Sequence, residues 1–183
     1  MKLLQAPRRA AVRLRDRIDA GLHSRRRERA LERLASIRPE SVLFICLGNV
    51  CRSPYAERVL TSLGTPGVAI TSAGFIKPGR PPADLAMEVA SRRGIDHSDH
   101  RSRVVTADDL READAVFFFD RFNKARLRGA EGVRMDRVFW MGDLEPTWGG
   151  RRAILDPWGK PREEFERVFD RIDRCVGELH RVL

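Results

Sequence analysis

A short apolar run that ends in a cysteine constrains this chain more than any other feature. Residues 42–54 read VLFICLGNVCRSP, so a strand-like segment leads directly into a tight loop. Pro54 fits the first turn of a helix, where its missing N–H costs nothing. A strand, a loop and a helix N-terminus in this order predict an anion-binding turn at the carboxyl end of a parallel sheet.

The residues of this loop suit a thiolate and a phosphate group together. Loop N–H groups and the positive end of the helix dipole face one point, and Arg52 adds a planar fork for two phosphate oxygens. Gly48 and Asn49 tolerate left-handed turns, and Ser53 can donate a hydroxyl hydrogen bond to sulfur. A cysteine in such a field is favoured as the reactive thiolate. A plain core cysteine is the alternative, but it leaves the other loop residues unexplained. We interpret the segment as a phosphate-binding loop with Cys46 as nucleophile.

After Pro39 the pattern alternates between strand and helix. We expect strands over residues 41–47, 68–72, 115–119 and 137–140, and helices over residues 54–63, 82–93, 121–128 and 163–183. The last helix is the most regular, because its apolar side chains recur at helical spacing along one stripe. Alternating elements predict an α/β fold with a parallel sheet covered on both faces.

Residues 1–40 form a basic, helix-prone N-terminal extension ahead of a domain at residues 41–183. The extension holds 12 Lys and Arg against 5 Asp and Glu, a net charge of +7 out of +9 for the chain. Two helical stretches are expected within it, with Gly21 interrupting the first. Their apolar positions are Ala11, Leu14, Ile18 and Leu22 in the first, and Ala30, Leu34 and Ile37 in the second.

The composition also limits the cellular compartments in which this protein is expected. The longest apolar runs are a handful of residues, far short of the ~20 that a transmembrane helix needs. The first residues contain no apolar segment long enough for a secretory signal. Three cysteines, two of them within the loop, do not make a disulfide framework. We therefore expect a cytoplasmic protein, with peripheral membrane association through the basic extension as an open possibility.

Four motifs together resemble the low-molecular-weight protein tyrosine phosphatase family. They are ICLGNVCRSPYAE at residues 45–57, TSAG at 71–74, GIDHSDHRSR at 94–103 and DPWG at 156–159. The resemblance covers about residues 41–183. It implies a four-stranded parallel sheet flanked by helices, in a flavodoxin-like phosphatase arrangement. It also implies a cytoplasmic hydrolase, although the arsenate reductases that resemble this family share the loop.

The chemistry that these residues imply is phosphoryl transfer through a covalent cysteinyl-phosphate. Cys46 attacks phosphorus, while Arg52 and the loop N–H groups hold the equatorial oxygens. Asp156 is the candidate proton donor for the leaving oxygen, because the Asp-Pro-aromatic triplet resembles the family's general-acid loop. A plain Asp-Pro turn is the alternative. The residues expected to bind phosphate or substrate are Leu47, Gly48, Asn49, Val50, Cys51, Ser53 and Trp158.

Further residues are assigned a supporting part by the same resemblance. Ser72 and His100 match side chains that brace the loop, and Asp120 matches a structural or orienting position. The remaining histidines are interpreted as ordinary polar residues of the surface. Cys51 has two open readings: it captures an oxidised Cys46 as a disulfide, or it is a small buried side chain. Neither a cofactor nor a metal is expected.

Three substrates compete on this fold. Phosphotyrosine needs an apolar cleft for a flat ring, which Leu47, Val50, Phe75 and Trp158 can provide. Phosphoarginine hydrolases of the family carry a polar hydroxyl residue at the Val50 position. Arsenate reduction needs further cysteines, and residues 73–119 contain none. We therefore favour a phosphotyrosine hydrolase.

The partner predictions follow from the same reasoning. By resemblance, the expected partner is a tyrosine-phosphorylated protein, with a bacterial tyrosine kinase as a candidate. An alternative of another class is that the chain is mainly a binding module with a degenerate phosphatase domain. Its basic arm would then dock on a membrane surface, an acidic polymer, nucleic acid or a protein partner. Nucleic acid is an unlikely partner.

Overall fold

The computed structural model describes residues 6–183, with side-chain positions from residue 17 onward. Predictions for residues 1–5, and for the side chains of Ala11 and Leu14, lie outside the described residues. None of the described helices combines the length and the apolar character that crossing a membrane requires.

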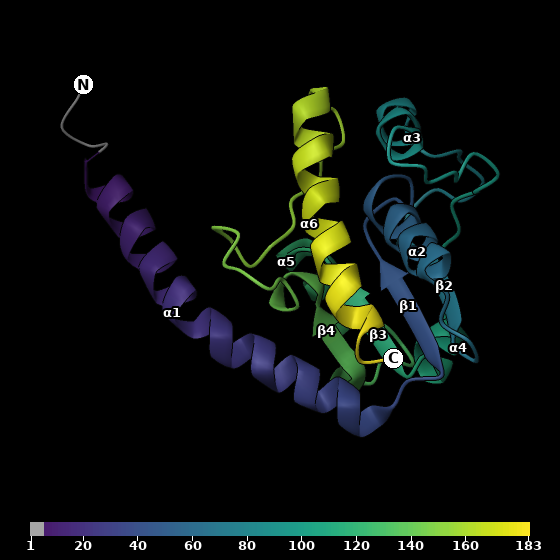
Figure 1. Cartoon of the computed structure of the whole chain (residues 1–183), viewed down its shortest axis with the longest axis horizontal. Helices are drawn as coiled ribbons and strands as arrows, with labels where there is room; N and C mark the ends of the chain where they lie inside the picture. Colours follow the sequence, from purple (N-terminus) through teal and green to yellow (C-terminus); the bar gives the residue numbers. More distant parts are fainter. Residues whose placement is uncertain (1–5) are drawn as a thin grey trace.

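Four parallel strands form the centre of the molecule in the order β2-β1-β3-β4 (Figure 1). They are β1 (Ser41–Ile45), β2 (Ala69–Ala73), β3 (Ala115–Phe118) and β4 (Val138–Trp140). One face of the sheet packs on α2 (Arg52–Leu63), α3 (Asp84–Ser91) and α6 (Arg162–His180). The other packs on α4 (Ala107–Glu112) and α5 (Arg121–Arg128). Short 3₁₀ turns, Met135–Arg137 and Met141–Asp143, flank β4.

The side chains of β1 show why this strand must be apolar throughout. Val42 and Phe44 belong to the core cluster beneath α2, α3 and α6. Leu43 and Ile45 point to the opposite face and belong to the cluster beneath α4 and α5. A strand covered on both faces cannot alternate between polar and apolar residues. The predicted fold class is confirmed: a four-stranded parallel sheet with helices on both sides.

All the predicted strands and helices of residues 41–183 are present, with ends that differ by up to three residues. One helix was missed, since α4 is only six residues long and shows little periodicity. Its start is nevertheless marked by a capping box. The Thr106 hydroxyl accepts from the Asp109 N–H, and the Asp109 carboxylate accepts from the Thr106 N–H.

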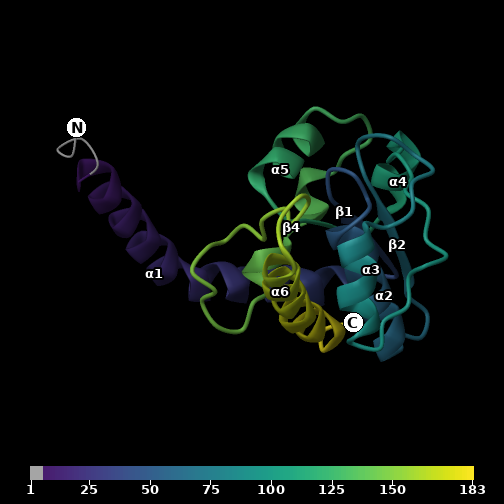
Figure 2. The ribbon, with the colours of Figure 1, turned by 90° about the horizontal axis from the view of Figure 1, so that it is seen from above.

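The predicted interruption at Gly21 is wrong, because α1 (Ala6–Ile37) is one continuous helix of 32 residues. In Figures 1 and 2 its N-terminal half extends away from the other elements, and its second half lies along them. A glycine costs a helix about 1 kcal/mol relative to alanine. Strong helix formers on both sides, and packing of the second half, outweigh that cost.

The second half of α1 is part of the main core. Ala30 and Leu34 are buried in the same cluster as α6, as their spacing predicts. His23 is buried too, so its assignment to the surface is wrong: its Nε2 lies 2.8 Å from the carbonyl oxygen of Glu145. By contrast, Ile18 and Leu22 are 54% and 38% exposed. Ile18 and Leu22, the two apolar positions of the first stretch whose side chains the structure describes, therefore do not join the core.

Candidate active site

The loop between β1 and α2 lies at the carboxyl end of the sheet. Cys46 follows the last residue of β1, and α2 begins six positions later at Arg52. Cys51 is the N-cap residue of α2, and no side chain caps this helix end. The first N–H groups of α2 therefore remain available to an anion at the loop.

Two hydrogen-bond donors are aimed at the sulfur of Cys46. The backbone N–H of Asn49 lies 3.2 Å from Sγ, and the hydroxyl of Ser53 lies 3.1 Å from it. Donors at these positions stabilise negative charge on sulfur. Asn49 adopts a left-handed backbone with φ of 52°, a conformation that asparagine tolerates better than most residues.

The side chain of Asn49 braces the loop from below. Its Nδ2 donates to the hydroxyls of Ser53 and Ser72 at 2.9 and 2.8 Å, and its Oδ1 accepts from the N–H of Arg103 at 3.0 Å. The ring of His100 contacts the carbonyl oxygen of Asn49 at 2.9 Å. The structure thus brings the two supporting residues of the sequence analysis, Ser72 and His100, to the same asparagine.

Gly48 serves the site differently from the prediction. Its φ is not positive, so the left-handed turn belongs to Asn49 alone. A Cβ on Gly48 would lie 2.9 Å from Nη2 of Arg80, and that guanidinium donates to the Gly48 carbonyl at 2.8 Å. Sequence reasoning missed Arg80, because no motif marks a residue from a distant loop. Gly48 is therefore needed for close approach.

Arg52 is buried and joins three elements. Its Nη1 donates to Asp120 at 2.6 Å and to the carbonyl of Ile154 at 3.0 Å, and its Nη2 pairs with Asp156 at 2.7 Å. Burial by itself lowers the pKa of Arg52, but Cys46, Asp156 and Asp120 outweigh it and raise the pKa above its ordinary value. The guanidinium therefore stays charged. Asp120 also caps α5 through its other oxygen.

A pocket of about 210 Å³ opens above the loop. Its lining residues come from the loop, from the segment after β2 and from the Asp156 loop: Cys46, Leu47, Gly48, Val50, Cys51, Ile76, Lys77, Arg80, Asp156 and Trp158. Trp158 is 58% exposed. The sequence predicted that Phe75 would line the cleft, and this is wrong: Phe75 is absent from the pocket lining and packs on the core beneath α4 and α5. Its place is taken by Ile76.

The two loop cysteines differ in their surroundings, although both are buried free thiols. Burial first, and then Cys46 and Asp156, raise the pKa of Cys51 far above its ordinary value. Cys51 is therefore held as a neutral thiol. Cys175, on the buried stripe of α6, is a core residue.

His97 is also buried, which corrects its assignment to the surface. Neither ring nitrogen has a partner among the described residues, and burial, followed by His100 and Arg58, lowers the pKa of His97 to about 4. In the described part of the chain, no three His, Cys, Asp or Glu side chains gather as a metal site requires.

This fold and loop define a class of protein. The family model described as low molecular weight phosphotyrosine protein phosphatase matches residues 41–183. The chain belongs to this family. The extension at residues 1–40 lies outside the match.

Individual relatives agree with the family. The chain is 33% identical over 138 residues to a probable low molecular weight protein-tyrosine-phosphatase, EpsP of Ralstonia nicotianae, covering 75% of this chain and 91% of the relative. The crystal structure of the tyrosine phosphatase AmsI of Erwinia amylovora superposes with a TM-score of 0.72 at 27% identity, covering 79% of this chain and 93% of AmsI. The YwlE arginine phosphatase of Geobacillus stearothermophilus superposes with a TM-score of 0.68 at 30% identity, covering 77% and 90%.

Proposed function

We propose that the chain hydrolyses phosphotyrosine on proteins through a cysteinyl-phosphate formed on Cys46. The observation that carries this proposal is the position of Cys46 Sγ, which accepts hydrogen bonds from the Asn49 N–H and the Ser53 hydroxyl at the base of the pocket. Sulfur attacks phosphorus, and the bond from phosphorus to the tyrosyl oxygen breaks. Arg52 and the free N–H groups at the start of α2 hold the equatorial oxygens, where charge spreads.

Asp156 is proposed as the general acid and then as the general base. Its carboxyl lines the same pocket as Cys46 and lies 2.7 Å from Nη2 of Arg52. The acid therefore stands beside the group that holds the phosphate. It gives a proton to the leaving tyrosyl oxygen, and afterwards takes one from the water that cleaves the phosphorus–sulfur bond.

The lining of the pocket supports an aromatic substrate. Leu47, Val50, Ile76 and Trp158 surround the space above Cys46 and offer apolar contact to a flat ring. Val50 has no hydroxyl to offer a phosphoguanidinium group. Phosphoarginine is the second candidate, because the arginine phosphatase YwlE superposes on this chain at 30% identity.

Turnover of matched phosphotyrosine and phosphoarginine peptides tests both parts of the proposal. The parent should prefer phosphotyrosine. Cys46→Ser should be inactive, and Asp156→Asn should lose about 10²- to 10⁴-fold in kcat, the usual worth of a positioned acid. Asp99→Asn is the matched control, because the Asp99 side chain is 73% exposed and its one ion-pair partner among the described side chains is Arg58. Activity in Cys46→Ser refutes the mechanism, and a preference for phosphoarginine refutes the substrate.

We further propose, on family resemblance, that the substrate is a tyrosine-phosphorylated protein, with a bacterial tyrosine kinase as the candidate.

A second proposal is that the protein is cytoplasmic and that its basic extension binds the membrane surface peripherally. Sedimentation with anionic vesicles across a salt series tests this proposal. Because Ala30 and Leu34 are packed in the core, the second half of the extension cannot use these two side chains to contact a membrane. Binding equal to that of neutral vesicles removes the membrane hypothesis.

A further inference from the structure

A second cavity lies between α1 and the edge strand β4, and we call it the α1–β4 groove. It measures about 350 Å³ and passes over the free edge of β4. Its lining residues are Arg26, Arg29, Ala30, Arg33, Phe118, Lys124, Met135, Val138, Phe139, Trp140, Asp143 and Arg152. None of them lines the pocket above Cys46.

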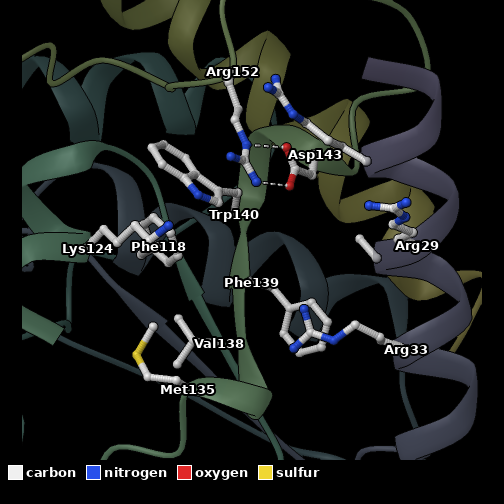
Figure 3. A pocket seen from close by; sticks show the side chains of 12 residues that line it. Arg29, Arg33, Phe118, Lys124, Met135, Val138, Phe139, Trp140, Asp143 and Arg152 are labelled. Carbon is white, nitrogen blue, oxygen red and sulfur yellow. Dashed lines mark hydrogen bonds and ion pairs between the residues drawn. The ribbon is translucent and has the colours of Figure 1, made fainter. Parts of the chain in front are cut away.

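The groove is strongly cationic. Five of its lining residues are Lys or Arg, and Asp143 is its one carboxylate. That carboxylate is taken by Arg152, which reaches its two oxygens at 2.7 and 2.6 Å. Arg29 and Lys124 have no carboxylate partner among the side chains that the structure describes. Figure 3 shows Arg29 on the α1 side of β4 and Lys124 on the opposite side.

Arg26 pairs with Asp19 and Arg152 with Asp143, but the charges around Lys124 are more positive than negative. The pKa of Lys124 lies below its ordinary value, mainly because of burial and then because of the nearby charges of Arg128 and Arg152. Asp143 acts in the opposite direction but is outweighed. An anion in the groove would reverse this imbalance.

Two of the arginines are held in place by aromatic rings. The guanidinium of Arg152 lies 4.6 Å from the centre of the Trp140 ring, and that of Arg33 lies 4.3 Å from the centre of the Phe139 ring. Stacked guanidiniums lose little further freedom when they bind an oxyanion through their edges. Arg152 also donates through Nε and Nη2 to Asp143, and Arg33 donates through Nη2 to the carbonyl oxygen of Asp136, so each guanidinium is fixed in position and keeps its remaining N–H groups for an anionic oxygen.

We propose that the α1–β4 groove binds a small molecule carrying two or more phosphate groups. Its volume falls at the lower end of the ~300–1,000 Å³ of small-molecule sites, which favours a compact ligand over an extended acidic peptide. Cations on both sides of β4 match a ligand with at least two charged groups, and arginine suits phosphate oxygens in particular. Because α1 lies outside the family match and contributes four of the twelve lining residues, the groove exists only where the extension packs against the family domain. It does not depend on the proposed phosphatase activity.

The three tryptophans make the test specific. Trp140 lines the groove and Trp158 lines the pocket above Cys46, so their indole N–H signals report the two sites separately. We suggest titrating ¹⁵N-labelled full-length protein with methylenediphosphonate, which resists hydrolysis, in near-physiological salt. Trp→Phe variants assign the signals. The Trp140 signal should shift saturably, and inorganic phosphate should bind more weakly.

Arg29→Gln combined with Lys124→Gln should weaken the Trp140 response at least about tenfold, because charge-assisted hydrogen bonds are lost. Arg92→Gln with Arg167→Gln is the charge-matched control on exposed positions of the α3 end and α6, and should keep the parent response. Before any ligand is added, a Trp158 signal at its parent position shows that each variant is folded. The proposal fails if Trp140 does not shift, if both double variants respond alike, or if hexaglutamate binds more tightly than the diphosphonate.

Discussion

At the scale of single residues, Asn49 sets the geometry around Cys46. Its main chain gives the sulfur one donor, and its side chain positions the Ser53 hydroxyl that gives the other. The same side chain reaches Ser72 below the loop. A residue that tolerates a left-handed backbone and offers both a donor and an acceptor is needed here, and glycine meets only the first requirement.

Ser53→Ala should lower kcat on a phosphotyrosine peptide by about ten- to a hundredfold, because a hydrogen bond to a charged group is worth about 1.5–3 kcal/mol. The substitution also removes one acceptor of the Asn49 side chain, which keeps its hydrogen bond to the Ser72 hydroxyl. Ser62→Ala, which removes only a hydroxyl bonded to the Val59 carbonyl within α2, is the control. Equal kcat for the two variants would show that the Ser53 hydroxyl does not act on the thiolate.

His97 makes a pH-dependent contribution to stability. Its pKa is lowered from 6.5 to about 4, so the unfolded chain binds more protons between these values. The contribution of His97 to the free energy of unfolding is therefore complete above pH 6.5. It is lost as the pH drops toward 4, by on the order of 3 kcal/mol in total. Denaturant unfolding between pH 5 and pH 6.5 avoids most carboxylate titration.

His97→Gln should flatten this slope, while His180→Gln, at a half-buried position near the end of α6, should keep it. The charged and titratable neighbours that act on His97 are His100, Arg58, Asp96 and Asp99. A slope unchanged in His97→Gln would assign the pH dependence to other groups.

At the scale of elements, α1 shows how packing outweighs a local signal. Glycine is a residue that often interrupts helices, yet α1 continues through Gly21. A Cβ at Gly21 would meet nothing within 4 Å, whereas a Cβ at Gly74 would lie 2.9 Å from the Asn49 nitrogen and the Leu47 oxygen. The two glycines look alike in the sequence and have opposite requirements.

Gly21→Ala should raise the free energy of unfolding, or the helical content of α1, by an amount that corresponds to about 0.5–1 kcal/mol. Gly74→Ala should destabilise the chain and displace the loop, with loss of activity. Circular dichroism, denaturant unfolding and turnover distinguish the two. A higher free energy of unfolding in Gly74→Ala would mean that the loop can move to make room for the added methyl group at little energetic cost.

At the scale of the whole molecule, the extension and the sheet share one core. Leu34 is fully buried against the cluster that also holds α6, whereas Leu22 on the same helix is 38% exposed. The basic extension is therefore partly a structural element and only partly a free arm.

Leu34→Ala should cost about 2–5 kcal/mol in a single cooperative denaturant transition, as for other large-to-small core changes. Leu22→Ala should stay within about 0.5 kcal/mol, as for exposed positions. If Leu34→Ala were equally mild, or melted α1 in a separate transition, the second half of α1 would not share the core.

The sequence by itself determined the alternation of strands and helices, the parallel sheet that follows from it, and the loop around Cys46. These features depend on periodicity and turn residues within consecutive segments of the chain. It also indicated Asp156, whose part in catalysis remains a prediction. Only the tertiary structure decided which distant residues meet: Arg80 on Gly48, Asp120 and Asp156 on Arg52, and α1 against β4. Such contacts join segments far apart in the chain, and no local pattern encodes them.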